Sequence, residues 1–486
     1  MQSFYFLGIA GTAMGSVAAA LAKLGYTVYG ADHQVYPPMS DYLKENGIVY
    51  TEGYSPDDII KTQPDVIVVG NAIARGNPAL EYALNEHMTL IAMPEIIRTY
   101  LIGRNTSVVI AGTHGKTTTA SLTAWLFESA GLEPGYLIGG VPRNFTQSCR
   151  AVPEHRNNTK SGFFVSEGDE YDSAFFDKRS KFLHYSPDIA VINNIEFDHA
   201  DIFHSLEDVK RTFRHFARII PQNGVLLIAA DEENSHNVAE GVPTKVETFG
   251  ISSAADWRAV DIRYTPTGTD FLLKREEQII GEFHLPMAGE HNLKNAVAAI
   301  ACALHAGADV ELLKVGLPKY LPPKRRMEVL KETNGITLID DFGHHPTAIR
   351  ETLAAIKQNY PGRRIVACFE PRSNTTTRNI FQKDLEDCFT DAEVVMIGAL
   401  NRPERYSDSE RLDTEAIARH VRRSGKVAYA VPVQHGRGNE WGELIGECLL
   451  KTVENGDVVV MLSNGDFGGL REILPKILDE RASVLL

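Results

Sequence analysis

The 486-residue chain is poor in cysteine and lacks long apolar runs. Its five cysteines, an odd number, lie far apart and never form a C-x-x-C pair, which is typical of a reducing compartment and offers no cysteine zinc site. No apolar run approaches the roughly 18 residues of a membrane span, and the first residues lack the basic stretch that opens a signal peptide. We therefore expect a cytoplasmic protein with no membrane partner.

Basic residues are also in deficit, because 49 Lys and Arg stand against 63 Asp and Glu and give a net charge of −14. This balance argues against a nucleic-acid surface, and it requires that any anionic ligand be held by local cations. A hydrophobic share of 43% excludes disordered and fibrous classes. At about 150 residues per domain, the length predicts roughly three domains.

The strongest motif is the Gly-Thr-His-Gly-Lys-Thr stretch that begins at Gly112, between a β-branched run and a helix-like segment. Gly112 and Gly115 let backbone N–H groups approach an anion, Lys116 can reach the β- and γ-phosphates, and the Thr117 hydroxyl suits Mg²⁺. The usual phosphate loop has another glycine where this chain has Ile110. The strand and helix context still predicts a nucleotide site, made of Gly112, Thr113, His114, Gly115, Lys116, Thr117 and Thr118.

The N-terminal segment has the order strand, glycine-rich turn, helix, strand, with Asp32 about 20 positions after the turn. A dinucleotide site is the first interpretation of this order. The glycines fall as G-x-x-G-x-x-x-G, however, so the G-x-G-x-x-G fingerprint is absent and another diphosphate suits the turn at least as well. A polar loop follows the next strand, where open α/β sheets bind ligands. The candidate substrate residues are Gly8, Gly11, Thr12, Asp32, Asn71, Arg75 and Asn77.

Two carboxylate clusters follow strands of the second α/β unit, one beginning at Glu167 and one reaching His199. These residues could be loop residues and helix caps. A magnesium triphosphate needs hard oxygen ligands, however, and both clusters lie in the segment that carries the phosphate loop. Further along, apolar and polar residues alternate at 264–283, which predicts an antiparallel hairpin. An alanine-rich helix follows and places Asn292 and Asn295 on one face.

A linker at 318–323 precedes a third domain, whose first strand ends in Asp340 and Asp341. This strand resembles a Walker B strand, but it lies far beyond the phosphate loop, so we assign Asp341 to a site completed across domains. Later strand ends supply the candidate substrate residues Arg372, Ser373, Asn374, Asn464 and Asp466. We predict an α/β fold of three domains: Rossmann-like at 1–104, P-loop ATPase-like at 105–321 and Rossmann-like at 322–486.

Together, these motifs closely resemble the Mur ligase family, the ATP-dependent amide-bond ligases of peptidoglycan assembly. The carrying motifs are the phosphate loop, Glu167, the stretch at 194–199, His291-Asn292-x-x-Asn295, Arg325-Arg326 and Asp340-Asp341-x-Gly-His-His-Pro. They occur in the family's order, and the resemblance covers essentially the whole chain.

The resemblance implies ATP and Mg²⁺ as cofactors. The catalytic residues would be Lys116, Glu167, His199 and Arg326, with Thr117, Glu167 and His199 holding metal ions. Asn292 and Asn295 would contact adenine, and Asp341 the ribose. His291, His344 and His345 could equally be structural.

The resemblance also implies the substrates. The glycine-rich turn looks like the branch that accepts UDP-N-acetylmuramate. Segments such as Arg75-Gly-Asn-Pro and Glu370-Pro-Arg-Ser-Asn-Thr look like the members that join L-alanyl-γ-D-glutamyl-meso-diaminopimelate to it during peptidoglycan recycling, through an acyl phosphate. The alternatives are addition of L-alanine to the same nucleotide, a nicotinamide-dependent dehydrogenase, and a P-loop regulatory ATPase that makes no bond. The oligomeric state is left open.

Overall fold

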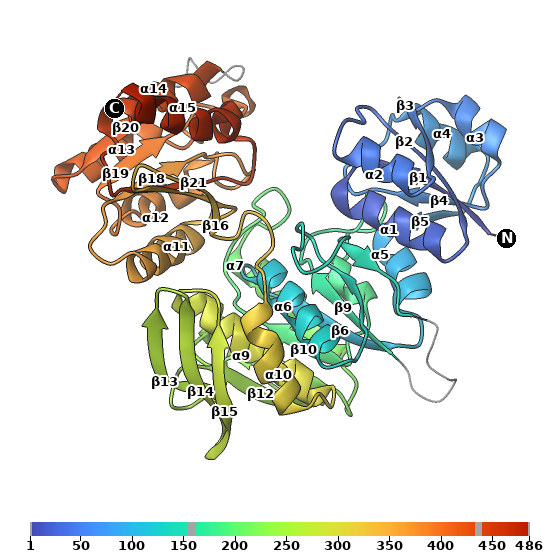
Figure 1. The fold of residues 1–486 in the computed structure, drawn as a ribbon. Coiled ribbons are helices and arrows are strands. Elements are labelled where there is room, and N and C mark those ends of the chain that lie inside the picture. The colour runs from blue at the N-terminus through green and yellow to red at the C-terminus, as the bar shows by residue number, and fades with distance from the viewer. Residues whose placement is uncertain (1, 154–161, 433–439, 485–486) are drawn as a thin grey trace.

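Three separate β-sheets organise the chain in the computed structural model, which describes residues 2–153, 162–432 and 440–484. Each sheet is parallel at its centre and is flanked by helices, as expected of α/β domains. Figure 1 shows the first and third domains at opposite ends of the central one. Within the described residues, no helix combines the length and apolarity that crossing a membrane requires.

The first domain has a five-stranded parallel sheet in the order β3-β2-β1-β4-β5. Its middle strands are almost continuously apolar because both faces are covered, and all four residues of Val66–Val69 are buried. The elements are β1 (Ser3–Leu7), α1 (Thr12–Lys23), β2 (Thr27–Asp32), α2 (Met39–Glu45), β3 (Val49–Glu52), α3 (Pro56–Thr62), β4 (Val66–Val69), α4 (Pro78–Asn85), β5 (Leu90–Ala92), α5 (Met93–Ile96) and the π-helix η1 (Ile97–Ile102).

The central domain has a ten-stranded sheet in the order β15-β14-β13-β12-β11-β10-β6-β9-β7-β8. The predicted hairpin at 264–283 belongs to a three-stranded antiparallel extension of this sheet. The strands are β6 (Thr106–Ala111), β7 (Gly135–Leu137), β8 (Cys149–Arg150), β9 (Phe163–Gly168), β10 (Ile189–Ile192), β11 (Val225–Ala229), β12 (Lys245–Gly250), β13 (Trp257–Thr265), β14 (Gly268–Arg275) and β15 (Gln278–Leu285). The helices are α6 (Lys116–Ser129), η2 (Lys181–His184), α7 (Leu206–Arg218), α8 (Glu233–Ala239), α9 (Glu290–His305), α10 (Val310–Gly316) and η3 (Leu317–Lys319).

The third domain has a six-stranded sheet in the order β16-β17-β21-β18-β19-β20, with only the edge strand β16 antiparallel. The strands are β16 (Glu328–Thr333), β17 (Ile336–Asp341), β18 (Ile365–Phe369), β19 (Val394–Ile397), β20 (Val427–Ala430) and β21 (Val458–Leu462). The helices are α11 (Pro346–Asn359), η4 (Asn379–Phe381), α12 (Gln382–Asp387), η5 (Pro403–Arg405), α13 (Thr414–Arg423), α14 (Glu440–Thr452), η7 (Phe467–Gly469) and α15 (Leu470–Val484).

The parallel strands place their carboxyl ends, and the polar loops that follow them, toward the junction of the domains. β6 lies between β9 and β10, so the phosphate loop, the Glu167 loop and the 193–201 loop leave the same edge of the sheet. In the third sheet β17 and β18 flank β21, which brings together the loops that begin at Phe342, Glu370 and Ser463. This arrangement positions the candidate site.

Candidate active site

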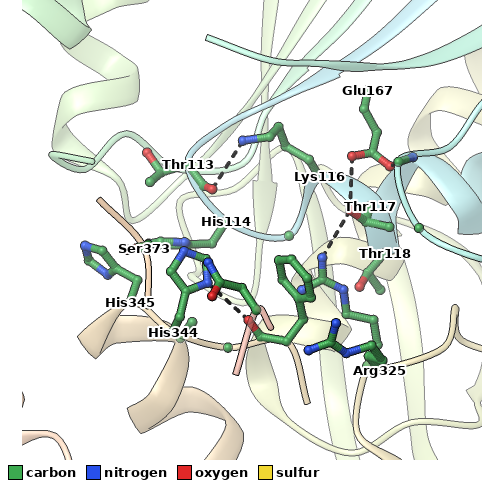
Figure 2. A pocket seen from close by; sticks show the side chains of 18 of the residues that line it. Thr113, His114, Lys116, Thr117, Thr118, Glu167, Arg325, His344, His345 and Ser373 are labelled. Carbon is green, nitrogen blue, oxygen red and sulfur yellow. Dashed lines mark hydrogen bonds between the residues drawn. The ribbon is translucent and has the colours of Figure 1, made fainter. Parts of the chain in front are cut away.

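A cavity of about 940 Å³ lies where the three domains meet. The N-terminal domain contributes Thr12 to its wall, the central domain contributes the phosphate loop, and the C-terminal domain contributes the loops after its parallel strands. Figure 2 shows the phosphate loop at its centre, with Glu167 and Thr117 on one side and His344 and His345 on the other. Residues from all three domains can therefore reach one bound substrate set.

The phosphate loop turns sharply between β6 and α6. Gly112 and Gly115 have positive φ values of 134° and 78°. A Cβ at Gly115 would lie 2.8 Å from Asn295 Oδ1 and 2.9 Å from Asn193 Nδ2, so a side chain there would collide as well as strain the backbone. Glycine thus keeps the backbone N–H groups at the start of α6 accessible to an anion.

Lys116 occupies the loop that a phosphate would enter. Its ammonium donates to Gly112 O (2.6 Å) and Thr113 O (3.3 Å) and pairs with Glu170 Oε2 at 2.9 Å. Burial alone would lower the pKa of Lys116, but Glu170 and Asp169 raise it above its usual value. The group therefore stays charged, and these internal partners hold it in place.

Glu170 contacts two of the predicted catalytic residues, Lys116 and His199. It is buried, and its Oε1 lies 3.4 Å from His199 Nε2 while Oε2 pairs with Lys116. Burial alone would raise the pKa of Glu170, but Lys116 and His199 lower it below its usual value. We did not select Glu170 from the sequence, although it belongs to the cluster that begins at Glu167, and the cluster alone does not reveal which carboxylate faces Lys116.

Thr117 and Glu167 form the opposite wall. Thr117 Oγ1 donates to Glu167 Oε2 (3.0 Å), and Arg326 Nη2 donates to Thr117 Oγ1 (3.1 Å), so Arg326 contacts the phosphate loop directly. Burial and the neighbouring Asp169 raise the pKa of Glu167. The predicted metal ligands are thereby divided between two places, with Thr117 beside Glu167 and His199 beside Glu170.

The predicted adenine and ribose residues line the same cavity. Asn292 and Asn295 are buried on α9, and Asn292 Nδ2 donates to Ala288 O (2.8 Å). Asp341 accepts hydrogen bonds from the backbone N–H groups of Met327 and Gly343, each at 2.8 Å, and thereby orients the segment that carries Arg326. Its contact with the ribose stays a prediction.

The predicted acceptor residues meet at the ends of β18 and β21. Arg372 forms ion pairs with Asp466 and, at 3.4 Å, with Glu370. Asn374 Nδ2 donates to Asp201 Oδ2 (2.9 Å) across the domain boundary. Asn464 Oδ1 is buried and has no hydrogen-bond partner among the described residues. The residues lining the cavity here are Arg372, Ser373, Asn374 and Asn464.

The candidate substrate residues of the N-terminal domain fall into two groups. Asp32 Oδ2 accepts from Ala10 N (3.0 Å) and thereby fixes the glycine-rich turn, whose Gly8 and Gly11 precede α1, and Thr12 at the start of α1 reaches the cavity. Other residues act locally: Asn77 caps α4, and Arg75 pairs with Glu81 at 2.9 Å. Asn71, Arg75 and Asn77 do not line the 940 Å³ cavity.

Several contacts between the central and C-terminal domains were not predicted. Thr347 Oγ1 donates to Glu196 Oε1 (3.0 Å), and Thr375 Oγ1 donates to Asp198 Oδ1 (2.8 Å). Each bond joins residues more than 150 positions apart. Because no local pattern signals such pairs, only the folded structure identifies them.

Family models match three consecutive parts of the chain. "Mur ligase family, catalytic domain" matches residues 3–102, "Mur ligase middle domain" matches residues 110–303, and "Mur ligase, glutamate ligase domain" matches residues 325–465. These matches support the three-domain α/β fold. The exact domain boundaries stay predictions.

Curated and solved relatives are similar over nearly their whole length. The UDP-N-acetylmuramate–L-alanyl-γ-D-glutamyl-meso-2,6-diaminoheptandioate ligase of Escherichia coli K12 is 37% identical over 98% of this chain and 97% of its own. A murein peptide ligase from Psychrobacter arcticus has a crystal structure with a TM-score of 0.72 and 33% identity, covering 98% of this chain and 99% of its own. The UDP-N-acetylmuramate–L-alanine ligase of Desulforapulum autotrophicum is 30% identical over 98% of both chains.

The similarity extends through all three sheets and all the loops that form the cavity. It exceeds 30% identity to proteins that the chain covers almost completely. The predicted α/β fold of three domains is confirmed. The chain belongs to the Mur ligase family and is a ligase.

Proposed function

We propose that the protein joins L-alanyl-γ-D-glutamyl-meso-diaminopimelate to UDP-N-acetylmuramate with hydrolysis of ATP, in the recycling of peptidoglycan. The observation that carries this proposal is the cavity shared by the three domains, which is lined by the phosphate loop, by Thr12 at the start of α1 and by the Arg372 region. The 37% identity to a ligase named for these substrates supports the same assignment. The free cysteines suit a cytoplasmic site of action.

The reaction needs activation because a carboxylate does not react with an amine at neutral pH. The muramate carboxylate attacks the γ-phosphorus of ATP, the bond to ADP breaks and an acyl phosphate forms. The peptide's α-amine then attacks the acyl carbon, loses a proton and expels phosphate. Lys116 and Arg326 neutralise charge on the transferred phosphoryl group, and the loop's N–H groups orient it.

The donor set of the cavity suits magnesium. Thr117 with Glu167, and Glu170 with His199, offer hydroxyl and carboxylate oxygens plus one imidazole beside the phosphate loop. Bound at these residues, Mg²⁺ would neutralise phosphate charge. Glu170 contacts both Lys116 and His199 and thereby keeps the lysine beside the phosphate loop.

The acceptor end favours a peptide over a single amino acid. Arg372 and Asp466 present opposite charges together, and Asn464 offers a buried oxygen that has no hydrogen-bond partner within the described part of the chain. A tripeptide that carries several carboxylates and a second amine can use all of these groups. L-alanine has only one carboxylate and one amine.

The deciding experiment is ADP release with UDP-N-acetylmuramate and, separately, the tripeptide or L-alanine. We expect turnover with the tripeptide and little with L-alanine. Faster turnover with L-alanine would instead support the amino-acid ligase. ATP hydrolysis that needs neither muramate nucleotide nor amine would support a regulatory ATPase.

A further inference from the structure

Three metal-ligating side chains meet at the boundary between the central and C-terminal domains, apart from the proposed magnesium residues. His114 belongs to the phosphate loop, Glu196 to the loop after β10, and His345 directly precedes α11. Glu196 Oε2 lies 2.8 Å from His114 Nε2 and 3.3 Å from His345 Nδ1. One ligand atom from each residue lies within 4.8 Å of the others.

His345 Nδ1 lies 3.3 Å from Glu196 Oε2 and also caps α11, where it accepts from the backbone N–H of Thr347 (3.3 Å), so this nitrogen carries no proton. An imidazole nitrogen has a single lone pair, so a bound cation would take that lone pair over from the Thr347 N–H. His345 Nδ1 and the Glu196 carboxylate are therefore two acceptors at 3.3 Å, an arrangement that a cation between them would stabilise.

His345 is also incompletely satisfied. Its side chain is only 6% exposed, and its Nε2 has no hydrogen-bond partner among the described residues. The ring centroids of His114 and His345 lie 4.4 Å apart, so the two imidazoles pack against each other beside the Glu196 carboxylate. A buried polar atom without a partner is costly, and such atoms cluster at functional positions.

The surroundings hold two of the three ligands in place. Thr347 Oγ1 donates to Glu196 Oε1 and leaves Oε2 free to face the histidines, and the His114 backbone N–H donates to Asn194 Oδ1 (2.8 Å). Outer contacts of this kind orient metal ligands. The Glu196 side chain is 32% exposed, which gives an ion access from solvent.

We propose that His114, Glu196 and His345 form a binding site for Zn²⁺ that bridges the phosphate loop and the C-terminal domain. Two imidazoles and one carboxylate suit zinc, whereas magnesium prefers oxygen ligands. Zinc bonds of about 2.0 Å separate tetrahedral ligand atoms by about 3.3 Å, so His114 must move about half an ångström from Glu196. The fourth position faces solvent and takes water.

Zinc at this site would act on the ligase as an inhibitor. It would fix the phosphate loop to the start of α11 and oppose relative motion of the two domains. Such motions commonly limit ligand entry and product release. Inhibition should therefore appear without displacement of Mg²⁺ from Thr117, Glu167, Glu170 or His199.

The test is equilibrium dialysis of the full-length protein against buffered Zn²⁺ with excess Mg²⁺ and no nucleotide, followed by metal analysis. We expect about one zinc per chain. His345→Gln and Glu196→Gln should each weaken binding about 100-fold or more. Glu196→Gln keeps the shape of the side chain, and a thermal melt verifies that both variants fold.

His199→Gln and His344→Gln are the matched controls. His199→Gln removes a proposed magnesium ligand, and His344→Gln removes the histidine next to His345, so both should retain zinc. Loss of zinc in His199→Gln with retention in His345→Gln would place the ion at the magnesium residues and overturn the proposal. Binding of less than about 0.1 zinc per wild-type chain would overturn it as well. Co²⁺ should give the intense visible bands of four-coordinate geometry in wild type and lose them in Glu196→Gln.

Discussion

At the scale of single residues, Lys116 has the clearest role. It is the cation that the phosphate loop itself supplies, and Glu170 and two loop carbonyls hold it in position. These contacts keep the ammonium group beside the phosphate loop.

Lys116→Ala should reduce ligation by about 10³-fold or more, because it removes charge stabilisation from the transferred phosphoryl group. The measurement is tripeptide-dependent ADP release, with circular dichroism to verify the fold. Lys357→Ala is the control, since Lys357 is exposed on α11 and pairs only with Asp391. Near-normal activity in a folded Lys116→Ala protein would contradict the assignment of the phosphate loop.

Arg372→Ala should raise the tripeptide KM about 10-fold or more, because a lost charged hydrogen bond costs about 1.5 to 3 kcal/mol. The KM values for ATP and UDP-N-acetylmuramate should hardly change. Arg419→Ala, at an exposed ion pair with Asp413, controls for general loss of charge. If all three KM values rise together, the Arg372–Asp466 pair supports the loop instead of the acceptor.

At the scale of secondary-structure elements, the antiparallel extension of the central sheet depends on one buried carboxylate. Glu247 on β12 accepts from Trp257 Nε1 (2.6 Å) and Arg275 Nη2 (2.9 Å) and contacts His305 Nε2 at 2.7 Å. Its side chain is 5% exposed. The residue therefore joins β12, β13, β14 and α9.

Glu247→Gln should lower the free energy of unfolding by about 2 kcal/mol, because it removes the charge that Arg275 and His305 contact and weakens their hydrogen bonds. Burial alone would raise the pKa of Glu247, but His305, Lys245 and Trp257 hold it well below its usual value. Because the pKa of this carboxyl is lower in the folded than in the unfolded protein, it stabilises the fold at a pH above its pKa in the unfolded chain. This stabilisation is lost progressively as the pH falls below about 4.5. The free energy of unfolding of the wild type should therefore fall on acidification, and that of the variant should fall less.

Urea unfolding at neutral pH and at about pH 4 measures both effects. Glu277→Gln is a matched control on the same sheet, because Glu277 is 86% exposed and pairs with Arg258 at 2.8 Å. It should change stability little at either pH. An equally stable Glu247→Gln protein would mean that the fold does not depend on this cluster.

The sequence predicted the strands and helices whose residue pattern lies within one continuous stretch of the chain. The β-branched strand before Gly112, the helix after it and the apolar strands ending in Glu167 and Asp341 each contain their own pattern. It did not predict β13 as a third antiparallel strand or the partnership of Lys116 with Glu170. Pairing across 54 positions depends on which strands become neighbours, and no local period encodes that.

At the scale of the whole molecule, the three sheets do not each have a separate hydrophobic core, because one core extends across two domains. One continuous cluster runs from Phe4 and Phe6 of the first sheet through Ile97 and Leu101 of η1 to Phe182 beneath the central sheet. The buried residues of the C-terminal domain form other clusters, and Phe197 of the central domain packs against both the first cluster and one of these. The first two domains thus share apolar packing, whereas the third contacts them through mainly polar bonds.

This distribution of apolar contacts has a calorimetric consequence. The N-terminal and central domains should melt as one cooperative unit and the C-terminal domain as another, giving two heat-absorption peaks. Leu353→Ala, deep in the C-terminal core, should cost about 2 to 5 kcal/mol and lower the temperature of one peak alone. Joint movement of both peaks would indicate that the polar contacts couple all three domains. If only one peak moves, the ligase has two cooperative units for its three sheets, and the C-terminal domain is the part able to unfold and refold by itself.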